Sequence, residues 1–221
     1  MGRELFFIQD LHNSTSRNYV DRMLDNKVEA MEKAKEYEFD YWDGSRRYGY
    51  GGYKFIDGRW KKLAEKLIER FQLTNQSTLL DVGCGKGFLL LEIQKILPGV
   101  TLYGIDISKY ALENLHPELK ISSYLISAAS EWPFELKQFD LVISINTLHN
   151  LKFQDLEMSL TNISKFGKDQ YIVVESFRNS LEQFNLECWA LTANLLLSKE
   201  DWIWTFKQMG YHGDFEFIYF Q

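Results

Sequence analysis

From residue 77 onward, short apolar runs alternate with stretches in which apolar residues recur every three or four positions. Uninterrupted apolar runs are typical of strands buried on both faces of a parallel sheet, and the recurring pattern is typical of helices. The predicted strands are 78–83, 101–106, 121–127, 139–146 and 170–176, and the predicted helices are 87–97, 108–115 and 153–166. This alternation predicts an α/β protein with a doubly wound, mostly parallel sheet.

The two ends of the chain follow other patterns. Residues 15–40 have the charged and apolar spacing of an amphipathic helix, and a segment dense in aromatic residues and glycine follows. Near the C-terminus, residues 211–220 read as one more strand. Because the crossover before it differs from the earlier ones, we expect this strand to pair antiparallel. Residues 1–58 are therefore predicted to form an N-terminal helix and lid, and residues 59–221 the sheet domain.

Composition narrows the class of protein. The 221 residues carry a formal net charge of −6, which disfavours a dedicated nucleic-acid binder. Only two cysteines are present, Cys84 and Cys188, and we expect both to be free thiols. Neither a signal peptide nor an apolar run of membrane-spanning length is evident. We therefore expect a cytoplasmic protein without a membrane segment.

A glycine-rich loop follows the first predicted strand. In "LLDVGCGKG", Gly83, Gly85 and Gly87 follow Asp81 and precede a helix, so the loop lies where ligands bind in such sheets. The spacing is not the G-x-G-x-x-G of dinucleotide sites, and Lys86 is not in the frame of a phosphate-binding loop. Asp81 would repel a pyrophosphate but attract an ammonium or sulfonium group.

Three segments in order resemble the class I S-adenosylmethionine-dependent methyltransferases. They are "LLDVGCGKG", "YGIDIS" and "FDLVISINTLHNL", and the resemblance covers roughly residues 60–221. It implies a Rossmann-like fold with S-adenosylmethionine as cofactor and S-adenosylhomocysteine as product. No metal is expected.

The resemblance also implies which residues contact the cofactor. Asp106 would accept hydrogen bonds from the ribose hydroxyls, although it could instead cap the next helix, a role that Ser108 also fits. An acid that often contacts the adenine in this family is replaced by Ala128, so backbone groups around Ala129, or the side chains of Ser127 or Ser130, would serve. The implied set is Asp81, Gly83, Cys84, Gly85, Gly87, Asp106, Ile107, Ala129 and Asn146.

Candidates for catalysis follow the later strands. His149 has the unperturbed pKa of a base at neutral pH, and Glu175 could orient the acceptor. Each also has a plain structural reading, as a packed loop histidine and as a charge that ends a strand. In the aromatic segment, Tyr48, Tyr53 and Arg59 are expected to lie on a lid near the cofactor carboxylate or the acceptor.

The leading hypothesis is methyl transfer to an oxygen or nitrogen atom of a small polar metabolite, with sugar derivatives among the candidates. RNA or protein methylation is an alternative, with nucleic acid less favoured. A third reading is a non-catalytic scaffold that keeps the fold. The sequence does not indicate how many copies of the chain associate.

Overall fold

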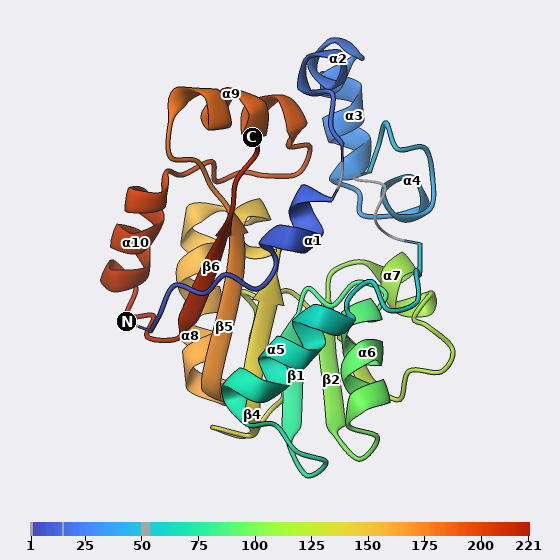
Figure 1. Cartoon of the computed structure of the whole chain (residues 1–221), viewed down its shortest axis with the longest axis vertical. Coiled ribbons are helices and arrows are strands. Elements are labelled where there is room, and N and C mark those ends of the chain that lie inside the picture. The colour runs from blue at the N-terminus through green and yellow to red at the C-terminus, as the bar shows by residue number, and fades with distance from the viewer. Residues whose placement is uncertain (1, 15, 50–53) are drawn as a thin grey trace.

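A computed structural model describes residues 2–14, 16–49 and 54–221 and contains one six-stranded sheet (Figure 1). The strands lie in the order β3-β2-β1-β4-β5-β6, and every neighbouring pair is parallel. The strands are β1 (Thr78–Val82), β2 (Thr101–Asp106), β3 (Ser122–Leu125), β4 (Phe139–Ile145), β5 (Gly167–Glu175) and β6 (Asp214–Ile218). The predicted class, a doubly wound α/β sheet of Rossmann-like type, is confirmed.

Helices cover both faces of the sheet. One apolar core lies between the sheet and α5 (Lys61–Phe71) and α6 (Phe88–Ile96). The other lies between the sheet and α8 (Phe153–Phe166) and α10 (Lys199–Gln208). The remaining helices are α1 (Gln9–Asn13), α2 (Tyr19–Leu24), α3 (Lys27–Ala34), α4 (Phe39–Trp42), α7 (Lys109–Glu113), η1 (Leu148–Asn150) and α9 (Ser180–Trp189).

The predicted direction of the last strand is wrong. Strand β6 pairs parallel with β5, with Glu175 opposite Ile218. The physical reason is the crossover, because α9 and α10 carry the chain back to the end of the sheet where β5 began. The segment between β5 and β6 has a different sequence pattern from the earlier crossovers. Its helices still bring the chain back across the sheet, so that the next strand runs parallel.

The predicted helix over residues 15–40 is also wrong in its continuity. It is interrupted at Asn26, whose φ of 43° is left-handed, so α2 ends before it and α3 starts after it. The Asn18 side chain caps α2 by accepting a hydrogen bond from the Asp21 N–H. Polar side chains that compete for backbone groups at such positions favour short helices with caps over one long helix.

The N-terminal segment lies against the sheet domain. Glu4 forms a parallel bridge with Phe215, and the Leu5 N–H donates to the Phe215 carbonyl over 2.8 Å. Two further backbone N–H groups, of Phe7 and Ile8, donate to the carboxylate of Glu216. Residues 3–5 therefore pair with β6 through a single bridge, and the Glu216 side chain holds residues 7 and 8 beside this strand.

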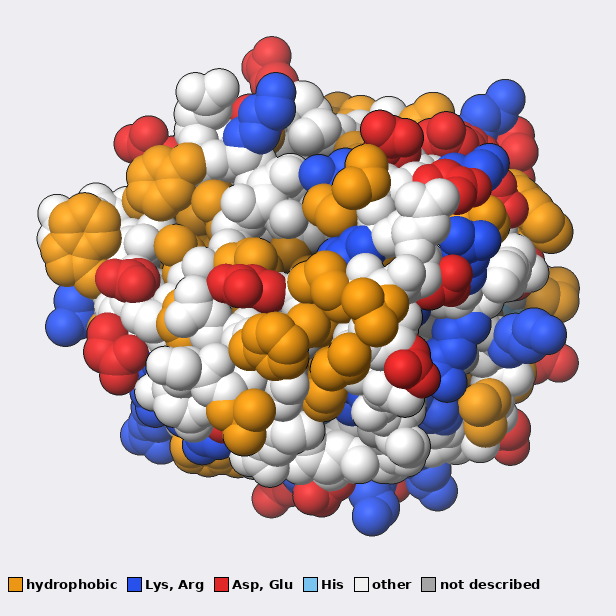
Figure 2. All heavy atoms as spheres, turned by 90° about the horizontal axis from the view of Figure 1, so that it is seen from above, with side chains coloured by type: hydrophobic (Ala, Val, Ile, Leu, Met, Phe, Trp, Pro, Cys, Tyr) orange, Lys and Arg blue, Asp and Glu red, His pale blue; other side chains and the backbone are white. Residues whose placement is uncertain are grey.

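Helices α2, α3 and α9 lie above the carboxyl edge of the sheet (Figure 1). Figure 2 looks down on this face and shows apolar patches between charged side chains. The exposed large apolar residues of these helices are Val20, Met23, Leu24, Val28, Leu181 and Phe184. In the described part of the chain, no helix combines the length and apolar character that crossing a bilayer requires.

Replacing Glu216 by Gln should destabilise the protein by about 2 kcal/mol. The buried Glu216 carboxylate accepts from Phe7, Ile8 and the Tyr171 hydroxyl, and an amide NH2 in its place would face a donor. Urea unfolding measures the loss, with the exposed Glu157→Gln as the matched control. Equal stability of the two variants would contradict this anchoring role.

Candidate functional site

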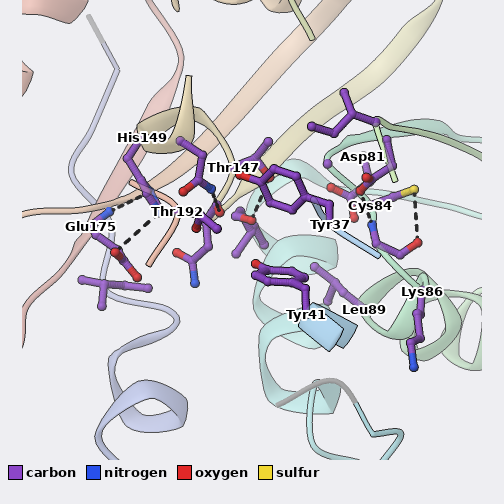
Figure 3. A pocket seen from close by; sticks show the side chains of 18 of the residues that line it. Tyr37, Tyr41, Asp81, Cys84, Lys86, Leu89, Thr147, His149, Glu175 and Thr192 are labelled. Carbon is purple, nitrogen blue, oxygen red and sulfur yellow. Dashed lines mark hydrogen bonds and ion pairs between the residues drawn. The ribbon is translucent and has the colours of Figure 1, made fainter. Parts of the chain in front are cut away.

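A cavity of about 470 Å³ lies at the carboxyl edge of the sheet. It is adjacent to the ends of β1 and β4, between which the strand order reverses, the place where open α/β sheets bind ligands. Figure 3 shows Asp81 and Cys84 at one end of the cavity and Glu175 with His149 at the other. Among the described residues, no cluster of His, Cys, Asp and Glu has the arrangement of a metal site.

The glycine loop is tightly packed and has a left-handed backbone at each of its three glycines. Gly83, Gly85 and Gly87 have φ values of 81°, 52° and 73°, which side chains rarely adopt. A Cβ on Gly83 would lie 2.0 Å from Oγ1 of Thr147, and one on Gly85 would lie 2.6 Å from the Trp42 ring. Gly83 and Gly85 line the cavity, whereas Gly87 caps the start of α6 and is not among the lining residues.

Asp81 is a buried acid without a full set of partners. It is the last residue but one of β1 and lines the cavity, and its Oδ1 atom accepts no hydrogen bond from any described residue. Burial, reinforced by the neighbouring Asp106 carboxylate, raises the pKa of Asp81 to about 8. The cavity therefore offers an unpaired acceptor at this point to a cationic ligand.

Asp106 lies beside Asp81 at the end of β2. Its Oδ2 accepts from the Gly85 N–H and its Oδ1 from the Ser108 N–H, both over 2.8 Å. Ser108, and not Asp106, caps α7 by accepting from the Ala111 N–H, which settles the alternative left by the sequence. Each carboxylate oxygen keeps a lone pair, so Asp106 can still accept hydroxyl groups of a ligand.

Of the other residues expected to contact the cofactor, some line the cavity and one does not. The exposed Ile107 side chain, Cys84 and Asn146 all line the cavity, and Asn146 has a left-handed φ of 56°. Burial raises the pKa of the Cys84 thiol well above its ordinary value, so it stays a thiol. Ala128 lines the cavity, but Ala129 is not among the lining residues and its N–H donates to Oγ of Ser127.

The lid docks directly on the glycine loop. The Trp42 indole N–H donates to Oγ of Ser108 over 2.8 Å, and Asp43 accepts from Lys86 Nζ at 2.6 Å. Tyr37 and Tyr41 also line the cavity (Figure 3). These contacts connect the lid to the loop that follows β1.

The structure places the three lid residues predicted from the sequence differently relative to the cavity. Arg59 lines the cavity. Tyr48 is not among the lining residues and contacts Glu29 through its hydroxyl at 3.2 Å. Tyr53 lies outside the residues that the structure describes.

His149 and Glu175 come together because β4 and β5 are neighbours. The Glu175 backbone N–H donates to Nδ1 of His149 over 3.3 Å, and Nε2 lies 3.5 Å from Oε2 of the carboxylate. Burial lowers the pKa of His149 to about 3 and raises that of Glu175 to about 7. Around neutral pH, Glu175 and not His149 has the pKa of a base.

The N-terminal segment adds cavity residues that the sequence did not reveal. His12 and Arg17 line the end near Glu175, together with Trp189 and Phe220. The Arg17 guanidinium lies 5.4 Å from the centres of both aromatic rings. These residues are far apart in the sequence and belong to no motif, so only the aromatic content of the chain could have hinted at them.

Comparison with known proteins identifies the central domain. A family described as "Methyltransferase domain" matches residues 79–170. This region is a methyltransferase domain of the class I S-adenosylmethionine-dependent family. It contains the glycine loop, Asp81, Asp106 and His149, and the methyltransferase fold extends from it through β6.

Individual relatives match the methyltransferase domain over part of their length. Ubiquinone biosynthesis O-methyltransferase of Hydrogenovibrio crunogenus is 30% identical over 116 residues, which is 50% of this chain and 45% of that protein. The mitochondrial arginine-hydroxylase NDUFAF5 of Mus musculus is 32% identical over 110 residues, 49% of this chain and 31% of that one. The chain thus matches less than half the length of either relative.

Solved structures share the fold. The plantazolicin methyltransferase BpumL, in complex with a desmethylPZN analogue and SAH, superposes with a TM-score of 0.57. The match covers 85% of this chain and 78% of that one at 17% identity. The methyltransferase fold therefore includes most of the helices and strands outside residues 79–170.

Replacing Asp81 by Asn should stabilise the ligand-free protein at pH 8 by roughly 5 kcal/mol and have little effect near pH 4. The pKa of this acid is raised to about 8 in the folded protein from 3.8, so wild-type stability falls as pH rises between these values. Urea unfolding at both pH values measures the difference. The exposed Asp10→Asn is the control, and an equal gain for both variants would contradict a buried, unpaired Asp81.

Proposed function

We propose that the protein is an S-adenosylmethionine-dependent methyltransferase that acts on an oxygen or nitrogen atom of a small molecule. The observation that carries this proposal is the single cavity that joins Asp81 and Asp106 at one end to Glu175 at the other. One end fits an adenosyl cofactor, and the other leaves room for an acceptor.

The residues at the first end suit each part of the cofactor. The unpaired Oδ1 of Asp81 would accept from the ammonium of its methionine part, and the remaining lone pairs of Asp106 would accept from the ribose hydroxyls. The apolar Ile107 and Ala128 side chains would contact the adenine. With Ala128 in place of an acid, adenine recognition rests on apolar contact and on backbone groups.

The cofactor, when bound, supplies a methyl group on a sulfonium, which is a good leaving group. The protein then needs mainly to align the acceptor and to exclude water. The aromatic residues Tyr37, Tyr41 and Trp42 of the lid line the cavity. Closing this lid over both ligands would position the acceptor for in-line attack.

A small acceptor is supported by the size of the site. A volume of about 470 Å³ lies within the range of ordinary small-molecule pockets, and it must hold the cofactor as well. The formal net charge of −6 and the small volume of the cavity do not suit a phosphate backbone. RNA methylation is therefore the weaker candidate.

The relatives leave the acceptor open. One is named for methylation in ubiquinone biosynthesis and another for arginine hydroxylation. Sugar derivatives stay among the small metabolites to be tested. The scaffold alternative predicts that the protein has lost cofactor binding.

We expect S-adenosylmethionine and S-adenosylhomocysteine to bind with micromolar affinity and NADH not to bind. Asp106→Ala should weaken both sulfur ligands about 100-fold, because two hydrogen bonds to a charged acceptor contribute roughly 1.5 kcal/mol each. Isothermal titration calorimetry with wild type and variant measures these affinities.

The control is Asp169→Ala, which removes an exposed acid at the opposite edge of the sheet. It should leave the affinities of both sulfur ligands unchanged. If wild type binds neither sulfur ligand, the methyltransferase proposal is wrong and the scaffold reading takes its place.

A further inference from the structure

The acceptor end of the cavity carries a second set of functional groups. Glu175 ends β5, and Ile218 lies opposite it on β6. Phe220 follows β6, and the His12 ring meets it edge-on with centroids 4.9 Å apart. Glu175 thus lies among residues from two strands and from the N-terminal segment.

The hydrogen bonds around His149 settle which group can take a proton. Because the Glu175 N–H donates to Nδ1 of His149, the proton of the neutral ring is on Nε2. Nε2–H is therefore a donor toward the carboxylate, 3.5 Å away, and has no lone pair to accept a proton. His149 can hold the Glu175 carboxylate in place but cannot serve as the base.

Glu175 retains an open position for a ligand. Its Oε2 is buried and forms no aligned hydrogen bond in the described ranges of the chain. The charged and titratable groups that face this carboxylate are His149, Arg17 and Arg22. Burial raises the pKa of Glu175 to about 7 even though both arginines lower it.

The same surroundings select among acceptors. The apolar side chains of Trp189, Ile218 and Phe220 line the cavity, with Ile218 opposite Glu175 on β6 and Arg17 over both aromatic rings. Arg17 places a fixed positive charge there, because both terminal nitrogens of its guanidinium donate to the His12 carbonyl. This charge opposes an incoming ammonium and favours an oxygen that gains negative charge.

We propose that Glu175 is the general base for methylation of an aromatic hydroxyl, with His149 as its positioning residue. This inference rests on the proposed methyltransferase activity. A phenolic hydroxyl, with a pKa near 10, is within reach of such a base, whereas an aliphatic alcohol is far less acidic.

The proposed step balances. The O–H bond breaks and its proton passes to the Glu175 carboxylate, while an oxygen lone pair forms the new bond to the methyl carbon. The carbon–sulfur bond breaks and its electron pair stays on sulfur. An aryl methyl ether, a neutral thioether and a protonated Glu175 result, and the proton then leaves to solvent.

The first measurement needs neither ligand. Infrared difference spectra, recorded in an Asp81→Asn background to remove the carboxyl band of Asp81, should show a protonated carboxyl band that titrates near pH 7 and is absent when Glu175→Gln is added. The control Glu182→Gln, a buried acid paired with Arg178 outside the cavity, should keep the band. A band that is unchanged in Glu175→Gln would overturn the assignment of the base.

The second measurement uses labelled S-adenosylmethionine with catechol, trans-1,2-cyclohexanediol and benzylamine as probes. We expect methylation of catechol alone, and Glu175→Gln should lower kcat about 100-fold with little change in KM. Methylation of only the diol or the amine, or of no probe although the cofactor binds, would overturn the acceptor class. Absence of cofactor binding would instead refute the proposed function. The infrared titration would still test the protonation of Glu175, because it needs no ligand.

The pH dependence of kcat tests whether His149 positions Glu175 or only contributes to folding. His149→Phe removes the N–H that stabilises the Glu175 carboxylate, so the pKa of Glu175 should rise and the acid limb of kcat should move up by about one pH unit. His149→Gln keeps a donor and an acceptor and should restore the wild-type profile. An unmoved limb in His149→Phe would contradict the positioning role.

Discussion

All six strands run in the same direction, and this parallel register decides where every functional group lies. Each strand ends at the same edge of the sheet, so Asp81, Asp106 and Glu175 line one cavity along that edge although they are widely separated in the sequence. The reversal of strand order between β1 and β4 leaves a crevice at that edge. Parallel pairing of β6 extends the edge and adds Ile218 to the cavity wall.

Two buried acids in the cavity, Asp81 and Glu175, destabilise the ligand-free protein because each has an oxygen atom without a hydrogen-bond partner among the described residues. Burial raises the pKa of Asp81 and of Glu175, and each has one oxygen without a hydrogen bond among the residues described. A cationic group at one end and a hydroxyl at the other would satisfy both atoms. Stability is thus lower where ligands are expected to bind, as is common for functional sites.

The chain closes this cavity with its own N-terminal residues. Glu216 anchors Phe7 and Ile8 against β6, which brings His12 and Arg17 to the acceptor end. Further along, Asp43 pairs with Lys86 of the glycine loop, so cofactor end and lid are in direct contact.

The sequence by itself determined the α/β class, the core strands and the glycine loop, because continuous apolar runs and glycine spacing are local features. Asp81, Asp106 and Glu175 were also recognisable, since each lies at or near the carboxyl end of a predicted strand. Only the tertiary structure decided the direction of β6, the break at Asn26 and the tautomer of His149. It alone placed Arg17 and Trp189 near Glu175, because such contacts depend on how distant segments pack and leave no periodic trace in the chain.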